Sequence, residues 1–265
     1  MAFAPPRYAE LDVTTNFSFL RGGSHPEELV ATAKLLGLEA IAVTDHNTLA
    51  GVVRGHLAAR EVDGIKFIVG VRLDLKDAPS LLAYPTDRSA YGRLCRLLTL
   101  GQRRADKGDC ILHLDDVAAH AEGLIFIVLP PDDFPSPSLL SSPGLTGRSS
   151  NHRSLDNEGP LLLDARFRGH DKGKFEDQLK RIKEMIGPRV RLYLAARHFY
   201  RGDDRARIAA LSELGNREEF LSSRPMACSI THPTGETFRT CSLRSARNAS
   251  SPRLVFASKP MPSGT

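Results

Sequence analysis

The sequence predicts an α/β fold in which short buried strands alternate with amphipathic helices. Four apolar or small residues, Ala40–Val43, form a run of the length expected for a buried strand. Helical stretches lie on both sides of this run, at residues 25–36 and 49–60. Because strands that alternate with helices of this length usually form βαβ units, we expect a parallel sheet.

The helix expected over residues 25–36 has signals at both ends. Ser24 is a good N-cap, Pro26 lies in the first turn, and Glu27 would close a capping box with Ser24. Gly37 ends the helix. By the same criteria we expect strands at 8–13, 65–75, 80–84, 123–129 and 190–195, and helices at 91–100, 115–121, 175–186 and 203–214.

Two segments break this pattern. Residues 134–173 are rich in Pro, Ser, Gly and Arg and show no sustained period, so we expect a disordered insert. Residues 219–265 form a segment that, from Phe220 onward, contains one acidic residue, Glu236, among many basic ones, and we expect a basic disordered tail. A short β-rich cap around residues 254–256 is the alternative. The folded domain would then comprise residues 1–133 and 174–218.

The composition indicates the cellular compartment in which the chain is expected. No apolar run reaches the roughly 20 residues of a membrane span, and the N-terminal sequence MAFAPPRYAE lacks the apolar centre of a secretory signal, so we expect a cytoplasmic protein without a membrane partner. The four cysteines form no CxxC pair, which favours reduced thiols. The formal charge of +5 would suit a partner with phosphates but does not by itself predict one.

The candidate site directly follows the strand at residues 40–43. Asp45 and His46 place a carboxylate and an imidazole at the carboxyl end of this strand, where α/β proteins bind ligands. Asn47 and Thr48 then offer N-cap chemistry for the helix at 49–60. A purely structural alternative is that Asp45 caps this helix and His46 packs against neighbouring loops.

Several blocks of the sequence together resemble a known family. They are YAELDVTTNFSFLRGGSHPEELV, GLEAIAVTDHNTLAGVVRGH, FIVGVRLDL, LLAYPTDRSAYGRLCRLLTLGQRRADKGDC and RLYLAARHFYRGDDRARIAAL. In this order they are similar to the N-terminal polymerase-and-histidinol-phosphatase (PHP) domain of a bacterial error-prone DNA polymerase of family C. The resemblance covers residues 8–129 and about 174–217. It implies a PHP-type distorted (β/α)7 TIM-like barrel, here incomplete at its C-terminal end.

The resemblance also implies metal ligands, which this sequence retains only in part. The Asp-His pair of the second motif is present as Asp45 and His46. The His-x-His of the first motif is replaced by Asp12 and Thr14, and a glutamate ligand by Arg72, whose positive charge would oppose a cation. A multinuclear site needs several imidazoles and carboxylates that converge. We therefore expect no cofactor, although weak binding of Zn, Mn or Mg at Asp45 and His46 stays open. Asp12 could bind a metal or make a hydrogen bond at the barrel mouth.

By this resemblance, we predict a PHP-domain fragment of an error-prone DNA polymerase. The parent activity would be DNA-directed DNA synthesis in damage-induced translesion synthesis and repair. This chain would lack that activity, because the palm carboxylates lie beyond the PHP domain. The repeat-like insert and the tail, which looks like an out-of-frame translation, lead us to expect a truncated and frameshifted product.

Two alternatives remain open. One is a metal-dependent phosphoesterase of the PHP superfamily. The other is a non-catalytic module that binds DNA or polymerase partners, for example through the basic residues of 93–107. The expected partners are the remaining polymerase domains or damage-tolerance proteins.

Overall fold

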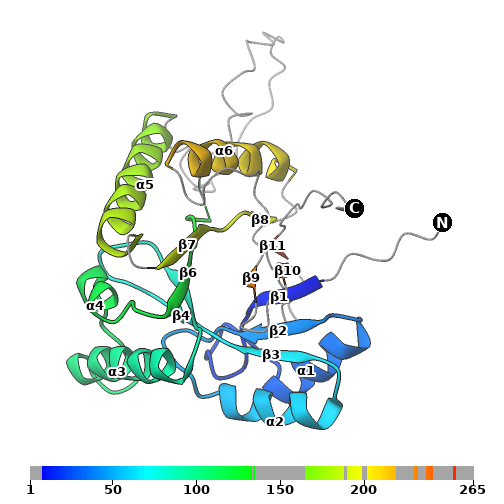
Figure 1. Ribbon diagram of the computed structural model, residues 1–265. Coiled ribbons are helices and arrows are strands. Elements are labelled where there is room, and N and C mark those ends of the chain that lie inside the picture. The colour runs from blue at the N-terminus through cyan, green and yellow to red at the C-terminus, as the bar shows by residue number, and fades with distance from the viewer. Residues whose placement is uncertain are drawn as a thin grey trace, which may run out of the picture.

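Two β-sheets face a shared apolar core, and helices cover their outer sides (Figure 1). The computed structural model of the chain describes residues 8–132, 134, 165–187, 190–198, 202–218, 230–231, 237–240 and 253–254. The five-stranded sheet has the order β3-β2-β1-β10-β9, and the four-stranded sheet the order β4-β5-β6-β7. Strands β8 and β11 form a separate pair.

The strands are β1 (Tyr8–Val13), β2 (Ala40–Val43), β3 (Lys66–Val69), β4 (Val71–Leu73), β5 (Leu81–Pro85), β6 (Leu124–Val128), β7 (Arg191–Leu194), β8 (Arg197–His198), β9 (Ile230–Thr231), β10 (Thr237–Thr240) and β11 (Arg253–Leu254). The helices are α1 (Pro26–Leu35), α2 (Val52–Val62), α3 (Arg88–Arg104), α4 (Leu114–Ala119), α5 (Ala165–Ile186) and α6 (Asp204–Arg217). Mixed α/β content is therefore confirmed.

The first sheet contains three neighbouring parallel strands. Strands β1, β2 and β3 are parallel neighbours, with β2 in the middle. Helices α1 and α2 pack on the outer face of these strands, where Val30, Ile41 and Ala58 belong to one buried cluster. The parallel βαβ arrangement predicted for this region is confirmed.

The chain passes from the first sheet to the second at Gly70. This residue lies between β3 and β4, so the single strand predicted at 65–75 is two strands. A Cβ atom on Gly70 would come within 2.7 Å of Tyr84 Cε1 and within 2.8 Å of Thr44 Cγ2. Only glycine allows this close approach.

The second sheet is mixed, whereas we predicted a parallel one. Strands β4 and β5 are antiparallel, as are β5 and β6, and only β6 and β7 are parallel. The prediction failed at β4–β5 because residues 74–80, which join these strands, contain no crossover helix, and a short connection favours antiparallel pairing. Helices α3, α4, α5 and α6 cover the outer face of this sheet, through a cluster that includes Leu97, Phe126 and Leu211.

The core between the sheets receives side chains from both of them. Alternate residues of each strand point into it, as the two-residue period of a strand requires. Its members are Ala9, Leu11, Ala40, Ala42, Leu82, Tyr84, Ile125, Ile127, Leu129, Tyr193 and Ala195. The Tyr84 hydroxyl donates a 2.7 Å hydrogen bond to the Leu11 carbonyl and so joins the two sheets.

Two predicted helix starts are wrong. The N-cap of α1 is His25 instead of Ser24, and Glu28 instead of Glu27 accepts a 3.0 Å bond from the His25 amide. Helix α2 begins at Val52 with Gly51 as its N-cap. The predicted cap Asn47 instead has a φ of 52° and accepts a bond from the Asp74 amide through its side chain.

Secondary structure also occurs in segments predicted to be disordered. Helix α5 begins at Ala165, inside the predicted insert 134–173, and strands β9, β10 and β11 lie in the predicted tail 219–265. Strand β10 pairs with β1, a long-range partner that no local period reveals. The rest of both segments lies outside the described residues, apart from residue 134 in the insert.

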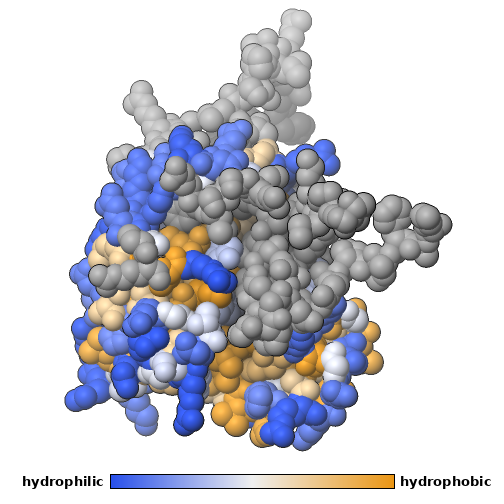
Figure 2. Space-filling view, viewed as in Figure 1, coloured by the Kyte–Doolittle hydropathy of each residue, from blue (hydrophilic) through white to orange (hydrophobic). Residues whose placement is uncertain are grey.

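Apolar side chains are exposed on α1, on α2 and on the loop after β1. Figure 2 shows such side chains at the lower edge of the molecule, where Figure 1 places α2. In the part of the chain that the structure describes, the exposed large apolar residues are Phe17, Phe19, Leu20, Leu35, Leu36, Val53 and Leu57. Among the described residues no helix is long and apolar enough to cross a membrane.

Candidate functional site

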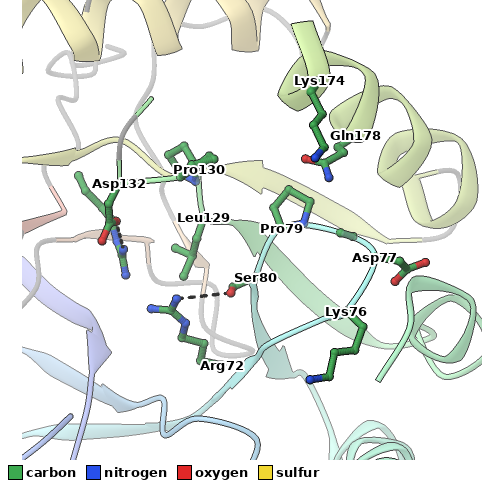
Figure 3. A pocket seen from close by; sticks show the side chains of 13 residues that line it. Arg72, Lys76, Asp77, Pro79, Ser80, Leu129, Pro130, Asp132, Lys174 and Gln178 are labelled. Atoms are coloured by element: carbon green, nitrogen blue, oxygen red, sulfur yellow. Dashed lines mark hydrogen bonds and ion pairs between the residues drawn. The ribbon is translucent and has the colours of Figure 1, made fainter. Parts of the chain in front are cut away.

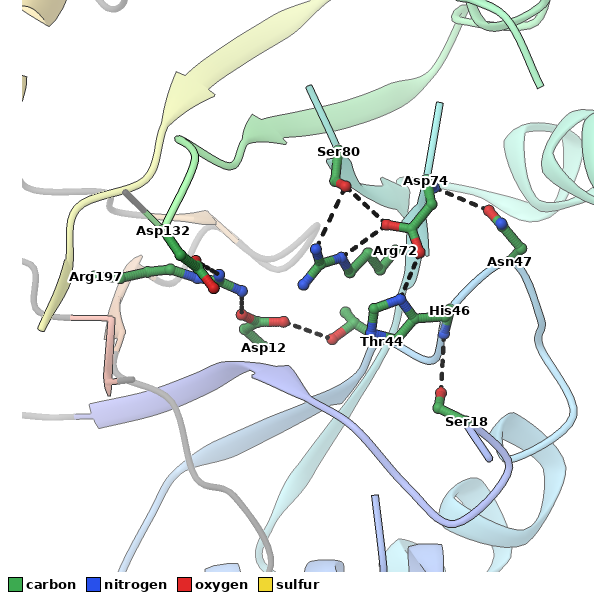
Figure 4. A network of polar contacts seen from close by, with 10 residues as sticks. All are labelled: Asp12, Ser18, Thr44, His46, Asn47, Arg72, Asp74, Ser80, Asp132 and Arg197. Atoms are coloured by element: carbon green, nitrogen blue, oxygen red, sulfur yellow. Dashed lines mark hydrogen bonds and ion pairs between the residues drawn. The ribbon is translucent and has the colours of Figure 1, made fainter. Parts of the chain in front are cut away.

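Polar side chains gather where β1, β2 and β4 end, beside a cavity of about 580 Å³ (Figures 3 and 4). Asp12 lies near the end of β1, Asp45 and His46 directly follow β2, and Arg72 lies in β4. The backbones of His46 and Arg72 form an isolated parallel bridge that joins the two sheets. The predicted position of Asp45 and His46 at the carboxyl end of β2 is confirmed, whereas Arg72 is the middle residue of β4.

Asp45 binds the loop that follows β1. It is 1% exposed, and its carboxylate accepts hydrogen bonds from the Thr15 amide at 2.8 Å, the Thr15 hydroxyl at 2.7 Å and the Ser18 hydroxyl at 2.6 Å. Ser18 Oγ in turn accepts a 3.0 Å bond from the His46 amide. Asp45 therefore fixes the loop after β1 and does not cap helix α2.

His46 pairs with a carboxylate that the sequence did not single out. Its Nδ1 lies 2.6 Å from Asp74 Oδ2. The other oxygen of Asp74 accepts bonds from Arg72 Nε at 3.0 Å and from Ser80 Oγ at 2.7 Å. His46, Arg72 and Ser80 thus converge on one carboxylate, with the Arg72 guanidinium at the centre of the polar network (Figure 4).

Asp12 is paired with Arg197, which comes from β8. Arg197 Nη2 donates to Asp12 Oδ2 at 2.6 Å, and the two side chains are only 7% and 8% exposed. Arg197 Nη1 also lies 3.3 Å from Asp132 Oδ1. Thr44 Oγ1 donates to the other oxygen of Asp12 at 3.3 Å.

The surroundings of the Asp12 and Asp74 carboxylates favour their charged forms. Burial alone would raise the pKa of Asp12, but the charges of Arg197 and Arg72 and the bonds from Arg197 and Thr44 hold it below its usual value. Burial acts in the same direction on Asp74, but the bond from His46 and the charge of Arg72 hold the pKa of Asp74 well below its usual range.

These residues do not fit a multinuclear metal centre. Asp12 is occupied by Arg197, Asp45 accepts bonds from the loop after β1, and Arg72 places a fixed positive charge among the carboxylates. Thr14, the second departing position, follows β1 and is half-buried. Within the described part of the chain, no three His, Cys, Asp or Glu side chains form a group that could hold a metal ion.

Only some of the missed residues could have been found by sequence reasoning. Asp74 lies two positions after Arg72 in the run VRLDL, so a strand period would place both side chains on one face. Arg197 lies in a two-residue strand, and no period marks it. Its pairing with Asp12 depends on the tertiary fold.

The basic stretch 93–107 is partly engaged in intrachain bonds. Arg93 Nε donates to the Glu122 carbonyl at 2.8 Å, and Arg104 forms a two-bond pair with Asp116. These two side chains hold α3 against α4 and the turn that follows it, so they are less available for DNA than the sequence alone indicated.

The amino-acid sequence matches the model of one protein family. This is the PHP domain, and the match covers residues 10–194. The matched region includes the end of β1, all of β2 to β7 and the polar residues described above except Arg197.

Curated relatives are error-prone DNA polymerases. "Error-prone DNA polymerase 2" of Rhizobium meliloti (strain 1021) is 60% identical over 124 residues, which are 47% of this chain and 11% of the relative. "Error-prone DNA polymerase" of Rhodopseudomonas palustris (strain HaA2) is 43% identical over 237 residues, covering 79% of this chain and 19% of the relative. The chain thus spans less than a fifth of the length of either relative.

A solved structure with a similar fold is a putative metal-dependent phosphoesterase from Bifidobacterium adolescentis. The TM-score is 0.51 at 16% sequence identity, and the similarity covers 82% of this chain and 86% of that one. At this identity the similarity supports the fold alone.

Proposed function

The chain belongs to the PHP domain family, and on this premise we propose that it is the PHP domain of an error-prone DNA polymerase with a non-catalytic, binding role. DNA-directed DNA synthesis in damage tolerance would be the activity of the longer parent protein. This chain, a PHP domain homologous to the N-terminal regions of such polymerases, would contribute a structural surface to that protein in the cytoplasm.

The observation that supports a non-catalytic role is the buried pair of Asp12 and Arg197. A phosphoesterase centre of this family would need ligands at the first motif, and here Asp12 is occupied by a guanidinium at 2.6 Å. Arg72 supplies a second positive charge. Two protein cations thus neutralise carboxylates that would otherwise attract metal ions.

We extend the proposal to the form of the fold, an incomplete TIM-like barrel. Three features support it. Side chains of both sheets share one inner core, strands β3 and β4 continue each other across Gly70, and the His46–Arg72 bridge joins the sheets along one edge. The helices then occupy the outside, as in other barrels.

The partner would be the remainder of the parent polymerase. On α2, Val53 and Leu57 are 63% and 51% exposed, and at the end of α1 Leu35 is 86% exposed. Exposed apolar side chains on neighbouring helices are typical of interaction surfaces. The matched polymerases are several times longer than this chain, so additional domains are available to cover this surface.

The experiment that separates this proposal from the phosphoesterase alternative compares hydrolysis by the chain with hydrolysis by a double variant. The purified chain should hydrolyse a generic phosphate monoester no faster than its Asp45→Ala, His46→Ala variant, with or without added Mn²⁺ or Zn²⁺. Metal-dependent turnover that the double variant abolishes would contradict the proposal and favour the phosphoesterase.

A further inference from the structure

The turn between α2 and β3 contains a dipeptide that is prone to a chemical change of its backbone (Figure 1). Its residues are Asp63 and Gly64, and both are exposed. In the complete sequence this is the only Asp-Gly pair, and no Asn-Gly pair occurs. Because glycine has no side chain, its amide nitrogen is not shielded from the carboxyl group of the preceding residue.

The backbone of Asp63 is strained. Asp63 is the C-cap of α2 and has a φ of 51° and a ψ of 152°. This combination lies next to a region that is populated almost only by glycine, and residues held in such conformations are often sites of chemistry. Gly64 follows with a φ of 70°. The turn thus leaves the regular backbone of α2 before the ladder of β3 begins.

The side chain of Asp63 folds back onto the next peptide unit. The Gly64 amide donates a 2.8 Å hydrogen bond to Asp63 Oδ1. The nitrogen of Gly64 therefore lies beside the carboxyl group that it can attack. Since the two groups belong to neighbouring residues, their reaction is intramolecular and needs no collision with another molecule.

Other aspartates of the described chain are held more firmly. Asp115 and Asp116 lie in α4, where helical hydrogen bonds fix the amides that follow them. The Asp87 carboxylate is engaged as the N-cap of α3. Asp12 and Asp45 are buried, and their carboxylates accept hydrogen bonds from other segments. The structure therefore singles out the open turn at residue 63.

From these features we propose that Asp63 is a site of spontaneous conversion to isoaspartate. The Gly64 nitrogen forms a bond to Asp63 Cγ and gives up its proton, while the protonated carboxyl group gives up its hydroxyl. One water molecule leaves, and a five-membered succinimide ring forms. Solvent water then adds to the main-chain carbonyl of Asp63 and breaks its bond to the Gly64 nitrogen. The main chain now runs through Cβ, and the former main-chain carbonyl carbon becomes a free carboxylate.

The change should weaken the connection between α2 and β3. Isoaspartate adds one atom to the main chain directly before Ile65, which is 7% exposed and belongs to the buried cluster under α1 and α2. The next residue, Lys66, pairs in register with Ala40 of β2. A longer main chain must displace one of these contacts, so the modified protein should unfold at a lower temperature. This inference does not depend on the polymerase assignment.

Ageing of the purified full chain tests the inference. The protein is kept in neutral buffer at 37 °C for several weeks and then digested with trypsin, which cleaves after Arg60 and Lys66 and so releases residues 61–66 as one peptide. We expect a second form of this peptide with the same mass and a different retention time. In the presence of an isoaspartyl methyltransferase, the new carboxylate of this form should accept a methyl group from S-adenosylmethionine.

Two variants test the position of the change. In Asp63→Glu the second form of the peptide should be lost, because the same attack would have to close a six-membered ring. The matched control is Asp109→Glu, since Asp109 is also exposed in a turn but is followed by Cys110. This control should form as much isoaspartate in residues 61–66 as the wild type.

Three outcomes would overturn the inference. The first is the absence of isoaspartate from residues 61–66 of the aged wild-type chain. The second is an equal methylation signal from this peptide in Asp63→Glu. The third is isoaspartate that forms in a sample unfolded in urea but not in the folded chain, because the folded turn would then prevent the reaction.

Discussion

Asp12 and Arg197 are 185 residues apart in the chain, yet Asp12 Oδ2 and Arg197 Nη2 lie 2.6 Å apart in a buried ion pair. The pair connects β1, the first described strand, to β8, which follows the last strand of the second sheet. Because both side chains are nearly inaccessible to water, each requires the other to offset the cost of burying a charge.

Removal of one residue of this pair should therefore lower the stability of the fold strongly. Arg197→Met leaves the Asp12 carboxylate buried without its main counter-charge, and we expect the free energy of unfolding to fall by about 3 to 5 kcal/mol. Urea denaturation at pH 7 measures this loss. The control is Arg217→Met, which removes an ion pair of an arginine that is 57% exposed and should cost less than about 1 kcal/mol. Similar losses in the two variants would mean that the buried pair is not a major stabilising contact.

Acid should weaken the fold through Asp74. Its folded-state pKa lies below the unfolded value near 3.8, so its stabilising contribution is complete above that value and is lost as the pH falls below it. Asp74→Asn should lower stability at pH 7 and flatten the dependence of the free energy of unfolding on pH between about pH 4 and pH 2. Parallel curves for the wild type and Asp74→Asn in acid would refute this account of Asp74.

Asp45 should act as the anchor of the loop after β1. Asp45→Ala removes the acceptor of three hydrogen bonds from Thr15 and Ser18, and we expect a loss of about 3 kcal/mol. Hydrogen exchange at the Thr15 amide should become much faster. The helix-cap variant Asp87→Ala removes a bond to the Ala90 amide, so it should destabilise α3 without changing exchange at Thr15. If the Thr15 amide is equally protected from hydrogen exchange in Asp45→Ala, Asp45 does not anchor this loop. Its carboxylate would then be available to a metal ion.

Replacement by alanine should have opposite effects on stability at two glycines. Gly70→Ala would place Cβ within 2.7 Å of Tyr84 and disturb the junction of the two sheets, which should cost about 1 to 3 kcal/mol. Gly92 lies inside α3, and a Cβ atom added there would meet no neighbouring atom within 4 Å, so Gly92→Ala should raise stability by about 0.5 to 1 kcal/mol. Thermal unfolding of the two variants measures both effects. A Gly70→Ala variant that is as stable as the wild type would mean that the sheets are not joined tightly there.

The local parts of this structure were predictable from the sequence. The limits of β1 follow from a run in which apolar and charged residues alternate, and the position of Asp45 and His46 after β2 follows from an apolar run that ends in polar residues. The break at Gly70 was not predicted, because a glycine inside a strand-like run is compatible with either a continuous or a bent strand.

The long-range parts were not predictable in this way. The pairing of Asp12 with Arg197 and that of β1 with β10 join segments that lie far apart in the chain. Residue type alone indicated that Arg72 would oppose a cation, but not that it would share Asp74 with His46 and Ser80. These contacts are set by the tertiary arrangement of the strand ends.

The central claim is that the guanidinium groups of Arg72 and Arg197 neutralise the carboxylates that would otherwise attract a metal cluster. The most direct test is the metal content of the purified chain after dialysis against a mixture of Zn²⁺, Mn²⁺ and Mg²⁺, measured by elemental analysis next to an Asp45→Ala, His46→Ala variant. We predict far less than one equivalent of metal per chain and no difference between the two proteins. One or more equivalents in the wild type, lost in the variant, would contradict the claim.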